Sequence, residues 1–328
     1  MTATLDASAL RARLRERLHR EELMTVPGGC TPLWAMMAQR AGFELFFLAG
    51  SQLSWFLYGV PDCGIVGLRD VVDHARHVAA RADIPVLVDA DTGYGNAVNV
   101  TYAVQEFVRS GVAGISIEDQ EAPKKSGTNA GRRCISLAEA TGKIRAAVAA
   151  RDELDPSFVV CARSDAIGAE GTGFEDALER CVAYSEEGGA DLVWLNSVES
   201  IDQLRTACAA LRVPVITIWG GSTSRPPLEE FATAGARAVL FPTVAASAGA
   251  QAAWDLLHDL QANGDGALEA WSARTRASPW GRAPSAELVG TPGLRALEER
   301  FIPADQQRDY ETTFGHDPGS SGRDRPEP

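Results

Sequence analysis

Short apolar runs recur along the chain, and each is followed by a turn and then by an amphipathic stretch. The runs have the length of strands buried on both faces, and the stretches between them have the period of helices. The expected strands are Leu23–Pro27, Glu44–Ala49, Pro85–Asp89, Gly114–Glu118, Phe158–Arg163, Leu192–Asn196, Pro214–Trp219 and Ala238–Pro242. Eight strand–helix repeats predict an α/β fold, a parallel sheet closed into a (β/α)8 barrel of the TIM type.

Helices are predicted between these strands, at Ala97–Ser110, Leu137–Ala150, Phe174–Glu187 and Ile201–Leu211. Glycines such as Gly111 and Gly188 follow the helical patterns directly, where a helix commonly ends. The segments therefore alternate in the way a closed parallel sheet requires.

The two ends of the chain extend this barrel. We expect an N-terminal helix in residues 1–22, the barrel in residues 23–262, a C-terminal helical extension in residues 263–302 and a disordered tail in residues 303–328. Within these parts, Val244–Gln261 is predicted to be the last barrel helix, Pro279–Pro284 a linker and Glu287–Phe301 a further helix. A helix after a complete barrel needs an apolar surface to cover, and a neighbouring subunit is one candidate.

Composition narrows the function classes. The net charge of −13 argues against nucleic acid or an anionic membrane as a partner. The chain has no apolar run of transmembrane length, and its charged N-terminal segment lacks the apolar core of a secretory signal. The six cysteines are scattered without a CxxC pair, which favours a reduced, cytoplasmic setting. No histidine ends a predicted strand, which weakens a zinc site or a histidine-based triad.

The strand Pro85–Asp89 runs into two carboxylates and a glycine-rich break. Asp89 and Asp91 lie two positions apart, so they project to the same side while the strand persists. Two adjacent carboxylates repel each other unless a cation lies between them, and Mg²⁺ prefers such oxygen ligands. The alternative is an acidic turn that caps the next helix.

Chemistry in a barrel gathers at the carboxyl ends of its strands. The other strand ends supply small residues, a third carboxylate and a guanidinium, with a further carboxylate in a nearby loop: Ala49, Gly50 and Ser51, then Glu118, Arg163 and Asp62. Such a set would chelate a small 2-oxo or 2-hydroxy acid through Mg²⁺ and stabilise an enolate. A structural ion pair is the alternative role for Arg163.

Four ordered motifs resemble the isocitrate lyase / phosphoenolpyruvate mutase superfamily. They are Asp89–Asn96, Ile117–Gln120, Pro123–Gly127 and Ala162–Ala166, within a resemblance that runs from about Val26 to Phe301. The fourth strand end, Glu118-Asp119-Gln120, and the C-terminal helix are most similar to 2-methylisocitrate lyase and carboxyphosphonoenolpyruvate mutase. The resemblance implies a homodimer or homotetramer in which the final helix is swapped between subunits.

The resemblance also implies a site. Mg²⁺, or Mn²⁺ in its place, would be bound around Asp89, Asp91 and Glu118, with Asp62 nearby. Small residues at the second strand end would bind the substrate through their backbone, namely Ala49, Gly50 and Ser51. Arg163 would bind the substrate carboxylate.

The catalytic loop departs from the lyase pattern. Lyases of isocitrate or 2-methylisocitrate carry Lys-Lys/Arg-Cys-Gly-His, whereas this chain reads Lys124-Lys125-Ser126-Gly127-Thr128. A serine hydroxyl is far less acidic than a thiol, whose pKa is about 8.5. Asn196 stands where those lyases place a glutamate after the sixth strand. These departures argue against a true isocitrate or 2-methylisocitrate lyase.

Three functions remain open. The first is a Mg²⁺-dependent lyase of a small carboxylic acid, which breaks or forms the C–C bond beside a metal-stabilised enolate. In it Lys124 supports charge, Ser126 or a water that it holds handles the proton, and Gly127 and Asn196 contact substrate; Asp89→Ala and Arg163→Ala should each abolish turnover. The second is a phosphonomutase or phosphonopyruvate hydrolase, whose chemistry needs no acidic thiol. The third is a catalytically silent metabolite-binding or scaffold barrel.

Overall fold

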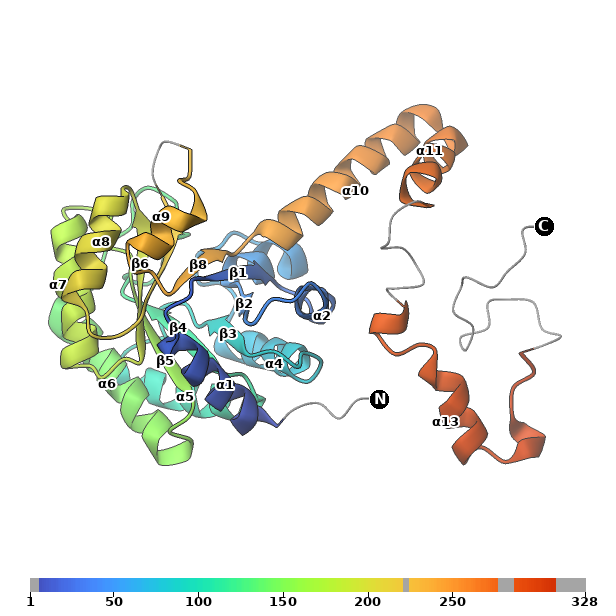
Figure 1. Cartoon of the computed structure of the whole chain (residues 1–328), viewed down its shortest axis with the longest axis horizontal. Helices are drawn as coiled ribbons and strands as arrows, with labels where there is room; N and C mark the ends of the chain where they lie inside the picture. The colour runs from blue at the N-terminus through green and yellow to red at the C-terminus, as the bar shows by residue number, and fades with distance from the viewer. Residues whose placement is uncertain (1–5, 221–223, 277–285, 311–328) are drawn as a thin grey trace. The chain divides into compact units, whose positions relative to one another are not determined.

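Eight parallel strands form the closed barrel, in a computed structural model that describes residues 6–220, 224–276 and 286–310 (Figure 1). Each strand pairs with the next, and β8 pairs with β1 to complete the ring. The strands are β1 (Met24–Gly29), β2 (Phe46–Leu48), β3 (Val86–Asp89), β4 (Gly114–Glu118), β5 (Val159–Ser164), β6 (Leu192–Val198), β7 (Val215–Trp219) and β8 (Ala238–Phe241). The predicted (β/α)8 barrel is confirmed.

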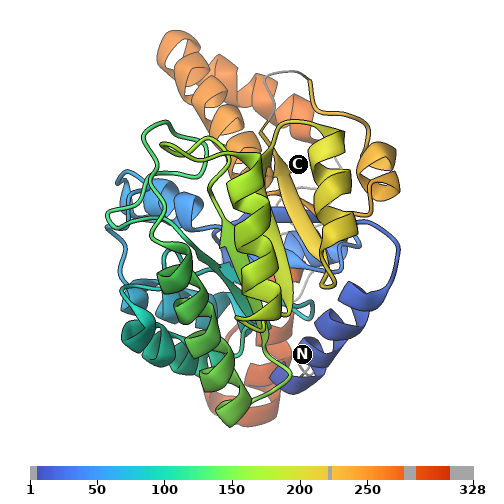
Figure 2. The ribbon, with the colours of Figure 1, turned by 90° about the vertical axis from the view of Figure 1, so that its left-hand side faces the viewer.

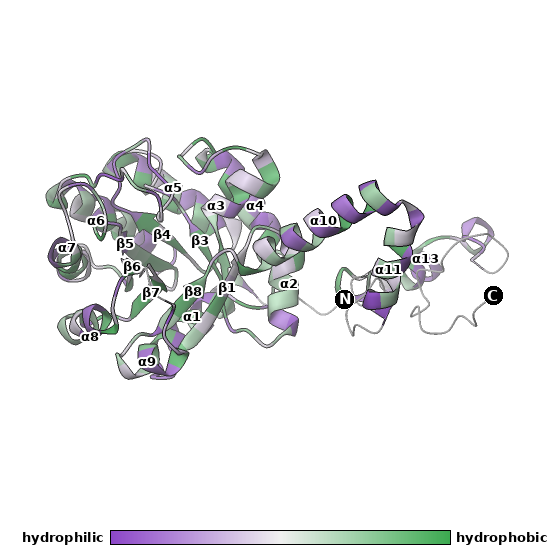
Figure 3. Ribbon diagram, turned by 90° about the horizontal axis from the view of Figure 1, so that it is seen from above, coloured by the Kyte–Doolittle hydropathy of each residue, from purple (hydrophilic) through white to green (hydrophobic). Residues whose placement is uncertain are grey.

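Helices surround the strands. They are α1 (Ala7–His19), α2 (Pro32–Arg40), α3 (Gly50–Gln52) with a π-helical turn (Leu53–Tyr58), α4 (Leu68–Ala79), α5 (Ala97–Ser110), α6 (Leu137–Leu154), α7 (Phe174–Glu186), α8 (Ile201–Ala210) and α9 (Leu228–Thr233). Figure 2 shows α6, α7 and α8 side by side in front of the sheet. Hydrophobic residues concentrate on the strands, and polar residues on the outer helix surfaces (Figure 3). The apolar runs therefore became strands because they are enclosed on both faces.

The described residues divide into two compact units, one up to residue 247 and the other from residue 248. The second unit holds most of α10 (Val244–Asn263), together with α11 (Asp265–Arg276), α13 (Gly293–Phe301) and a 3₁₀ turn (Ala304–Gln306). Within the described residues, no helix is both long and apolar enough to cross a bilayer.

Two predicted boundaries differ in the second unit. The helix predicted at Glu287–Phe301 is interrupted: residues 286–288 are helical, residues 289–292 form a turn in which Gly290 adopts a left-handed φ of 83°, and α13 begins at Gly293. The tail predicted to be disordered from residue 303 contains the 3₁₀ turn, and the Tyr310 hydroxyl donates to Glu298 at 2.6 Å. The predicted linker Pro279–Pro284 and the tail beyond residue 310 lie outside the described residues.

Helix α1 lies across the amino-terminal ends of β4 and β5. Arg11 Nε donates to the carbonyl of Val112 at 3.0 Å, and Arg15 Nε donates to the carbonyl of Ser157 at 2.8 Å. Leu14 and Leu18 join the apolar cluster inside the barrel, which includes Val26. The N-terminal helix thus closes the end of the barrel opposite the predicted site.

Leu14→Ala is expected to lower the free energy of unfolding by about 2–5 kcal/mol, because Leu14 is 1% exposed and truncation leaves a cavity at the barrel end. Urea unfolding followed by circular dichroism measures it. Leu154→Ala is the matched control, since Leu154 is 42% exposed and a surface truncation costs about 0.5 kcal/mol. Equal losses in the two variants would contradict this role for α1.

A half-buried histidine on α4 predicts sensitivity to acid. Burial lowers the pKa of His74, whose Nε2 contacts the Cys30 carbonyl. The unfolded chain, with a histidine pKa of about 6.5, therefore binds a proton more readily than the folded chain, and stability falls as the pH drops below that value. His74→Gln should flatten this fall in urea midpoints between about pH 7.5 and 5. A profile parallel to that of the wild type would exclude His74 as its source.

Candidate active site

The carboxylates at the ends of β3 and β4 lie at one mouth of the barrel. Asp91 takes a left-handed φ of 48°, and its backbone N–H donates to Asp89 Oδ1 at 3.1 Å. The Glu118 N–H donates to the carbonyl of Asp91 at 2.9 Å, which ties the two strand ends together. All three side chains are buried, with 9% exposure at most. The structure places the three residues predicted as metal ligands at adjacent strand ends on one mouth of the barrel.

Gly50, at the start of α3, packs against this cluster. Its N–H faces Asp89 Oδ2 at 3.3 Å, and a Cβ at this position would lie 3.1 Å from that oxygen and 3.3 Å from Asp91 Oδ1. The Ala49 N–H donates to the carbonyl of Gly29 at 3.1 Å, whereas Ser51 is half-buried beside it. Backbone groups at this strand end therefore meet protein carboxylate and carbonyl oxygens as well as the space predicted for substrate.

Arg163 lies among the carboxylates. Its guanidinium is 3.3 Å from Glu118 Oε2 and 4.0 Å from Asp89 Oδ2, and it donates to both oxygens of Asp165 at 2.8 and 3.0 Å. Burial alone would lower the pKa of Arg163, but Asp165 and Glu118 raise it further above its usual value. A permanently charged, oriented guanidinium thus stands at the end of β5.

Trp194 supports Arg163 from within the barrel. The guanidinium lies 4.4 Å from the centre of the Trp194 ring, and that ring meets Phe47 edge-on at 5.3 Å. A tryptophan on a barrel strand suits either the outer pocket or the core, and the Trp194 side chain, 2% exposed, belongs to the barrel core. Its contribution to the site is through the position of Arg163.

The loop between β4 and α6 folds back over the barrel mouth. We call residues 120–134 the active-site loop, whose base is an isolated antiparallel bridge between Gln120 and Cys134. From this loop Lys124 Nζ reaches Asp62 Oδ1 at 2.6 Å and Asp91 Oδ1 at 2.7 Å. Burial would lower the pKa of Lys124, but Glu118 and Asp91 raise it well above its usual value. Lys124 and Asp62, predicted to be catalytic, thus meet one of the predicted metal ligands.

The remaining predicted residues lie in this loop or against it. Ser126 is 9% exposed. The carbonyl of Gly127 accepts a hydrogen bond from Asn196 Nδ2 at 3.0 Å. A Cβ on Gly127 would lie only 2.1 Å from an Arg163 nitrogen, so the loop passes directly over the guanidinium. Asn196, predicted to contact substrate, contacts the loop in this structure.

Burial leaves the carboxylates poorly satisfied. Neither oxygen of Glu118 accepts a hydrogen bond, and burial raises the Glu118 pKa well above its usual value despite the attraction of Arg163. Burial likewise raises the pKa of Asp91 to about 6, against the attraction of Lys124. A buried carboxylate without hydrogen-bond donors is costly when ionised, and a bound cation would stabilise its negative charge.

No three Asp, Glu, His or Cys side chains of the described residues are grouped tightly enough to hold a metal ion as they stand. Lys124 and Arg163 lie against the same carboxylates and supply the positive charge. The donor set nevertheless has the chemistry that a hard divalent cation prefers, since every donor is a carboxylate oxygen.

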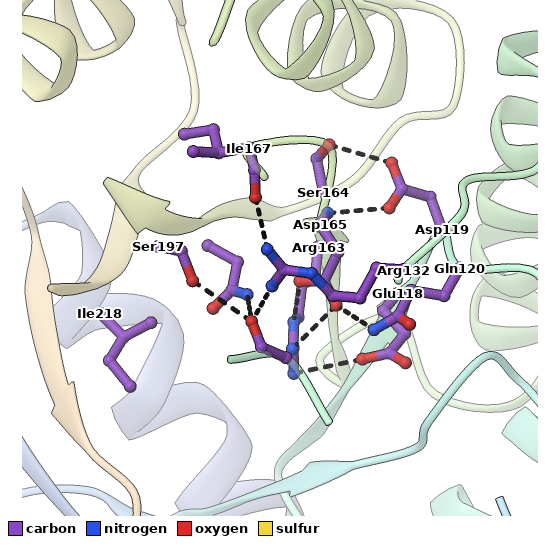
Figure 4. Close-up of polar contacts among 12 residues, drawn as sticks. Glu118, Asp119, Gln120, Arg132, Arg163, Ser164, Asp165, Ile167, Ser197 and Ile218 are labelled. Atoms are coloured by element: carbon purple, nitrogen blue, oxygen red, sulfur yellow. Dashed lines mark hydrogen bonds and ion pairs between the residues drawn. The ribbon is translucent and has the colours of Figure 1, made fainter. Parts of the chain in front are cut away.

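A second layer of contacts, which sequence reasoning did not predict, fixes Arg163 from behind. Asp119 accepts hydrogen bonds from the Asp165 N–H at 2.8 Å, from Ser164 Oγ at 2.9 Å and from the Tyr184 hydroxyl at 2.8 Å. Gln120 Nε2 donates to Asp165 Oδ2 at 2.5 Å (Figure 4). Asp119 and Gln120 belong to the motif Ile117–Gln120, but nothing in the sequence indicated which side chains they would contact.

Comparison with known proteins shows that the chain matches one enzyme family. Residues 14–260 match the family model described as phosphoenolpyruvate phosphomutase. The chain is 34% identical over 254 residues to 2-methylisocitrate lyase of Shewanella oneidensis, an alignment that covers 77% of this chain and 85% of that protein.

Solved structures with the same fold include two hydrolases. Oxaloacetate acetylhydrolase in complex with 3,3-difluorooxalacetate has a TM-score of 0.79 at 29% identity, over 90% of this chain and 97% of the other. Phosphonopyruvate hydrolase in complex with oxalate and Mg²⁺ has a TM-score of 0.75 at 29% identity, over 91% of this chain and all of the other. The resemblance inferred from the motifs is confirmed.

Proposed function

Because the chain belongs to the phosphoenolpyruvate phosphomutase family, a group of enzymes that includes lyases, we propose that it is a Mg²⁺-dependent carbon–carbon lyase. Its substrate would be a small 2-oxo or 2-hydroxy carboxylic acid, and the bond broken or formed would lie next to an enolate. The observation that carries this proposal is the position of Arg163, held at a buried barrel mouth against Asp89 and Glu118.

The proposed metal ligands are Asp89, Asp91 and Glu118, with Mn²⁺ as a possible substitute for Mg²⁺. The unsatisfied oxygens of Glu118 support a cation here, and one structural neighbour holds Mg²⁺ with oxalate. A bound divalent cation would supply the Lewis acidity that stabilises negative charge on an enolate oxygen.

The chain's own residues perform the other tasks in this proposal. Arg163 offers two parallel N–H groups to a substrate carboxylate, which fixes the acid in one orientation. Lys124, 3% exposed, places a positive charge beside the carboxylates, and Asp62 holds its ammonium group. Ser126, or a water that it holds, delivers or accepts the proton, while Gly127 and Asn196 close the space above Arg163 and exclude water.

A second candidate is the cleavage or transfer of a P–C bond, as in phosphonomutases and phosphonopyruvate hydrolases. Ser126 favours it, because that chemistry needs no acidic thiol in the loop. The similarity to phosphonopyruvate hydrolase also supports it.

Assembly and location are part of the proposal. From the family resemblance we propose a homodimer or homotetramer with a swapped C-terminal helix, which light scattering of the full chain would test. All six cysteines are free, which supports a reduced, cytoplasmic setting.

Thermal unfolding against a panel of small acids, each with and without Mg²⁺, tests the function. The panel holds oxaloacetate, pyruvate, 2-methylisocitrate, alkyl-substituted malates, phosphoenolpyruvate and phosphonopyruvate. A ligand at a hundredfold excess over its Kd stabilises the fold by about 2.7 kcal/mol. A Mg²⁺-dependent rise confined to carbon acids supports the lyase, and one confined to phosphorus compounds, checked by phosphorus NMR, supports the second candidate. An unmoved melting temperature throughout would support a silent barrel instead.

A further inference from the structure

Three hydrogen-bond donors converge on one carbonyl oxygen of the active-site loop. The Gly127 carbonyl accepts from Asn196 Nδ2 at 3.0 Å, from Ser197 Oγ at 3.3 Å and from the Arg132 guanidinium. Figure 4 shows the Ser197 hydroxyl and the Arg132 guanidinium pointing toward this same part of the loop. Arg132 belongs to the loop itself, whereas Asn196 and Ser197 belong to β6, two strands along the barrel from β4, where the loop begins.

The strand β6 is irregular at this point. Leu195 pairs with Thr217 and Val198 pairs with Trp219. Between these two pairs β6 therefore contains one residue more than β7. The extra residue forms a β-bulge around Asn196 and Ser197, a feature that commonly re-aims side chains beside active sites.

The bulge holds Ser197 in an uncommon conformation. Its φ is 59°, in the left-handed region that residues other than Gly, Asn and Asp seldom adopt. A Cβ on Gly220 would lie 2.6 Å from Ser197 Cα, so the neighbouring chain presses closely on this position. Thr217 Oγ1 donates to the carbonyl of Leu195 at 2.8 Å and holds the strand just before the bulge. This strained backbone conformation directs the Ser197 hydroxyl toward the loop.

The loop is held at a second point by Gln120. Its side-chain oxygen accepts from the Lys125 N–H at 2.9 Å, and its amide nitrogen donates to the Lys125 carbonyl at 2.9 Å. Ser126 therefore lies between two backbone anchors, at Lys125 and at Gly127, and Lys124 directly precedes the first of them. Anchoring the backbone at these two residues restricts where the side chains of Lys124 and Ser126 point.

We propose that Asn196 and Ser197 form a latch that holds the active-site loop closed over Arg163. They act as positioning residues, through the Gly127 carbonyl, and place Lys124 and Ser126 for the reaction. The proposal deepens the proposed function and rests on it for the roles of those two side chains, but the latch itself is a property of the loop. The predicted substrate contact of Asn196 becomes, in this proposal, a contact with the loop.

Limited trypsin digestion of the full chain, without any substrate, tests the latch. The loop offers cleavage sites at Lys124, Lys125, Arg132 and Arg133, and Lys125 is exposed. Cleavage of a transiently opened segment tracks the population of its open form. Asn196→Ala should speed cleavage within residues 124–133 about fivefold, as expected for one lost hydrogen bond. Asn196→Asp should speed it more than about tenfold, because a carboxylate oxygen would face the carbonyl oxygen of Gly127.

Two substitutions at Ser197 separate the latch from a purely structural role. Ser197→Ala and Ser197→Gly both remove the hydroxyl, so both should speed cleavage severalfold. Glycine accepts a positive φ without strain, so Ser197→Gly should also melt at a higher temperature than Ser197→Ala. General destabilisation would make the less stable Ser197→Ala the faster of the two to be cleaved, whereas loss of the latch speeds cleavage in both variants to a similar degree.

Asn129→Ala is the matched control, because Asn129 lies in the same loop with an exposed side chain. It should be cleaved at the wild-type rate. Wild-type cleavage rates in Asn196→Asp and in both Ser197 variants would overturn the latch. Because the digestion contains no substrate, this outcome is distinct from failure of the proposed function, which the thermal panel detects.

Discussion

Replacing Arg163 with alanine is expected to lower turnover by about a thousandfold or more, because it removes the only guanidinium that the described residues place against Asp89 and Glu118. The loss should appear in kcat as well as in kcat/KM, since Arg163 is proposed to hold the substrate carboxylate in the orientation that the reaction requires. Steady-state kinetics on the substrate identified by the thermal panel measures it. Arg163→Lys should recover little, because an ammonium cannot make two parallel hydrogen bonds to a carboxylate.

Arg133→Ala provides the matched control. Arg133 also forms an ion pair with a carboxylate, Glu170 at 2.7 Å, but its side chain is 65% exposed. This variant should keep wild-type turnover. Circular dichroism of Arg163→Ala must accompany the kinetics, because Asp165 loses its partner in that variant. A folded Arg163→Ala enzyme with turnover within about tenfold of the wild type would refute the proposed role.

Asp119→Ala is expected to cost about 3–5 kcal/mol of the free energy of unfolding, the largest effect on stability that we predict. Asp119 is 2% exposed and accepts hydrogen bonds from Ser164, Tyr184 and the Asp165 N–H, with Arg180 at 3.4 Å. Alanine would leave these buried donors and the Arg180 charge without their acceptor. Urea unfolding monitored by circular dichroism measures the difference.

An exposed aspartate in an ion pair serves as the control for Asp119. Asp152 lies 2.6 Å from Arg151 but is 56% exposed, so Asp152→Ala should cost less than about 1 kcal/mol. Asp119→Ala should also lower turnover, since the Asp165 N–H that it holds positions the carboxylate partner of Arg163. A loss of stability no greater than that of Asp152→Ala would show that Asp119 is not a structural centre of the site.

The fold was predictable because the signal is local and repeated. The strand Gly114–Glu118 and the helix Ala97–Ser110 have the predicted bounds, since an unbroken apolar run and a helix ending at Gly111 mark them clearly. Eight such repeats leave little choice of architecture. The C-terminal helix was less predictable, because its amphipathic pattern continues through residues 287–292, where the backbone turns at Gly290.

In the candidate site, only the residues at the carboxyl ends of the strands were predictable from the sequence. Residues at the carboxyl ends of neighbouring strands must meet, so the approach of Asp89, Asp91, Glu118 and Arg163 follows from the barrel itself. How the active-site loop folds back is not encoded in any periodicity. The contacts of Lys124 with Asp62 and of Gln120 with Asp165 therefore required the structure. The core position of Trp194 was also ambiguous, since a tryptophan on a barrel strand suits the core or the mouth.

The bulge in β6 also makes the contact between β6 and the active-site loop sensitive to the number of residues in the strand. The bulge adds one residue to β6, so deleting one residue at Asn196 or Ser197 would restore regular pairing with β7 and leave only one of the two side chains that reach the Gly127 carbonyl. A single deletion would thus weaken the hold on the loop without changing Arg163 or the carboxylates at the other strand ends. Relatives could gain or lose this hold on the loop through one-residue insertions in β6. An alignment that places the gap elsewhere would pair Asn196 with a residue of different geometry.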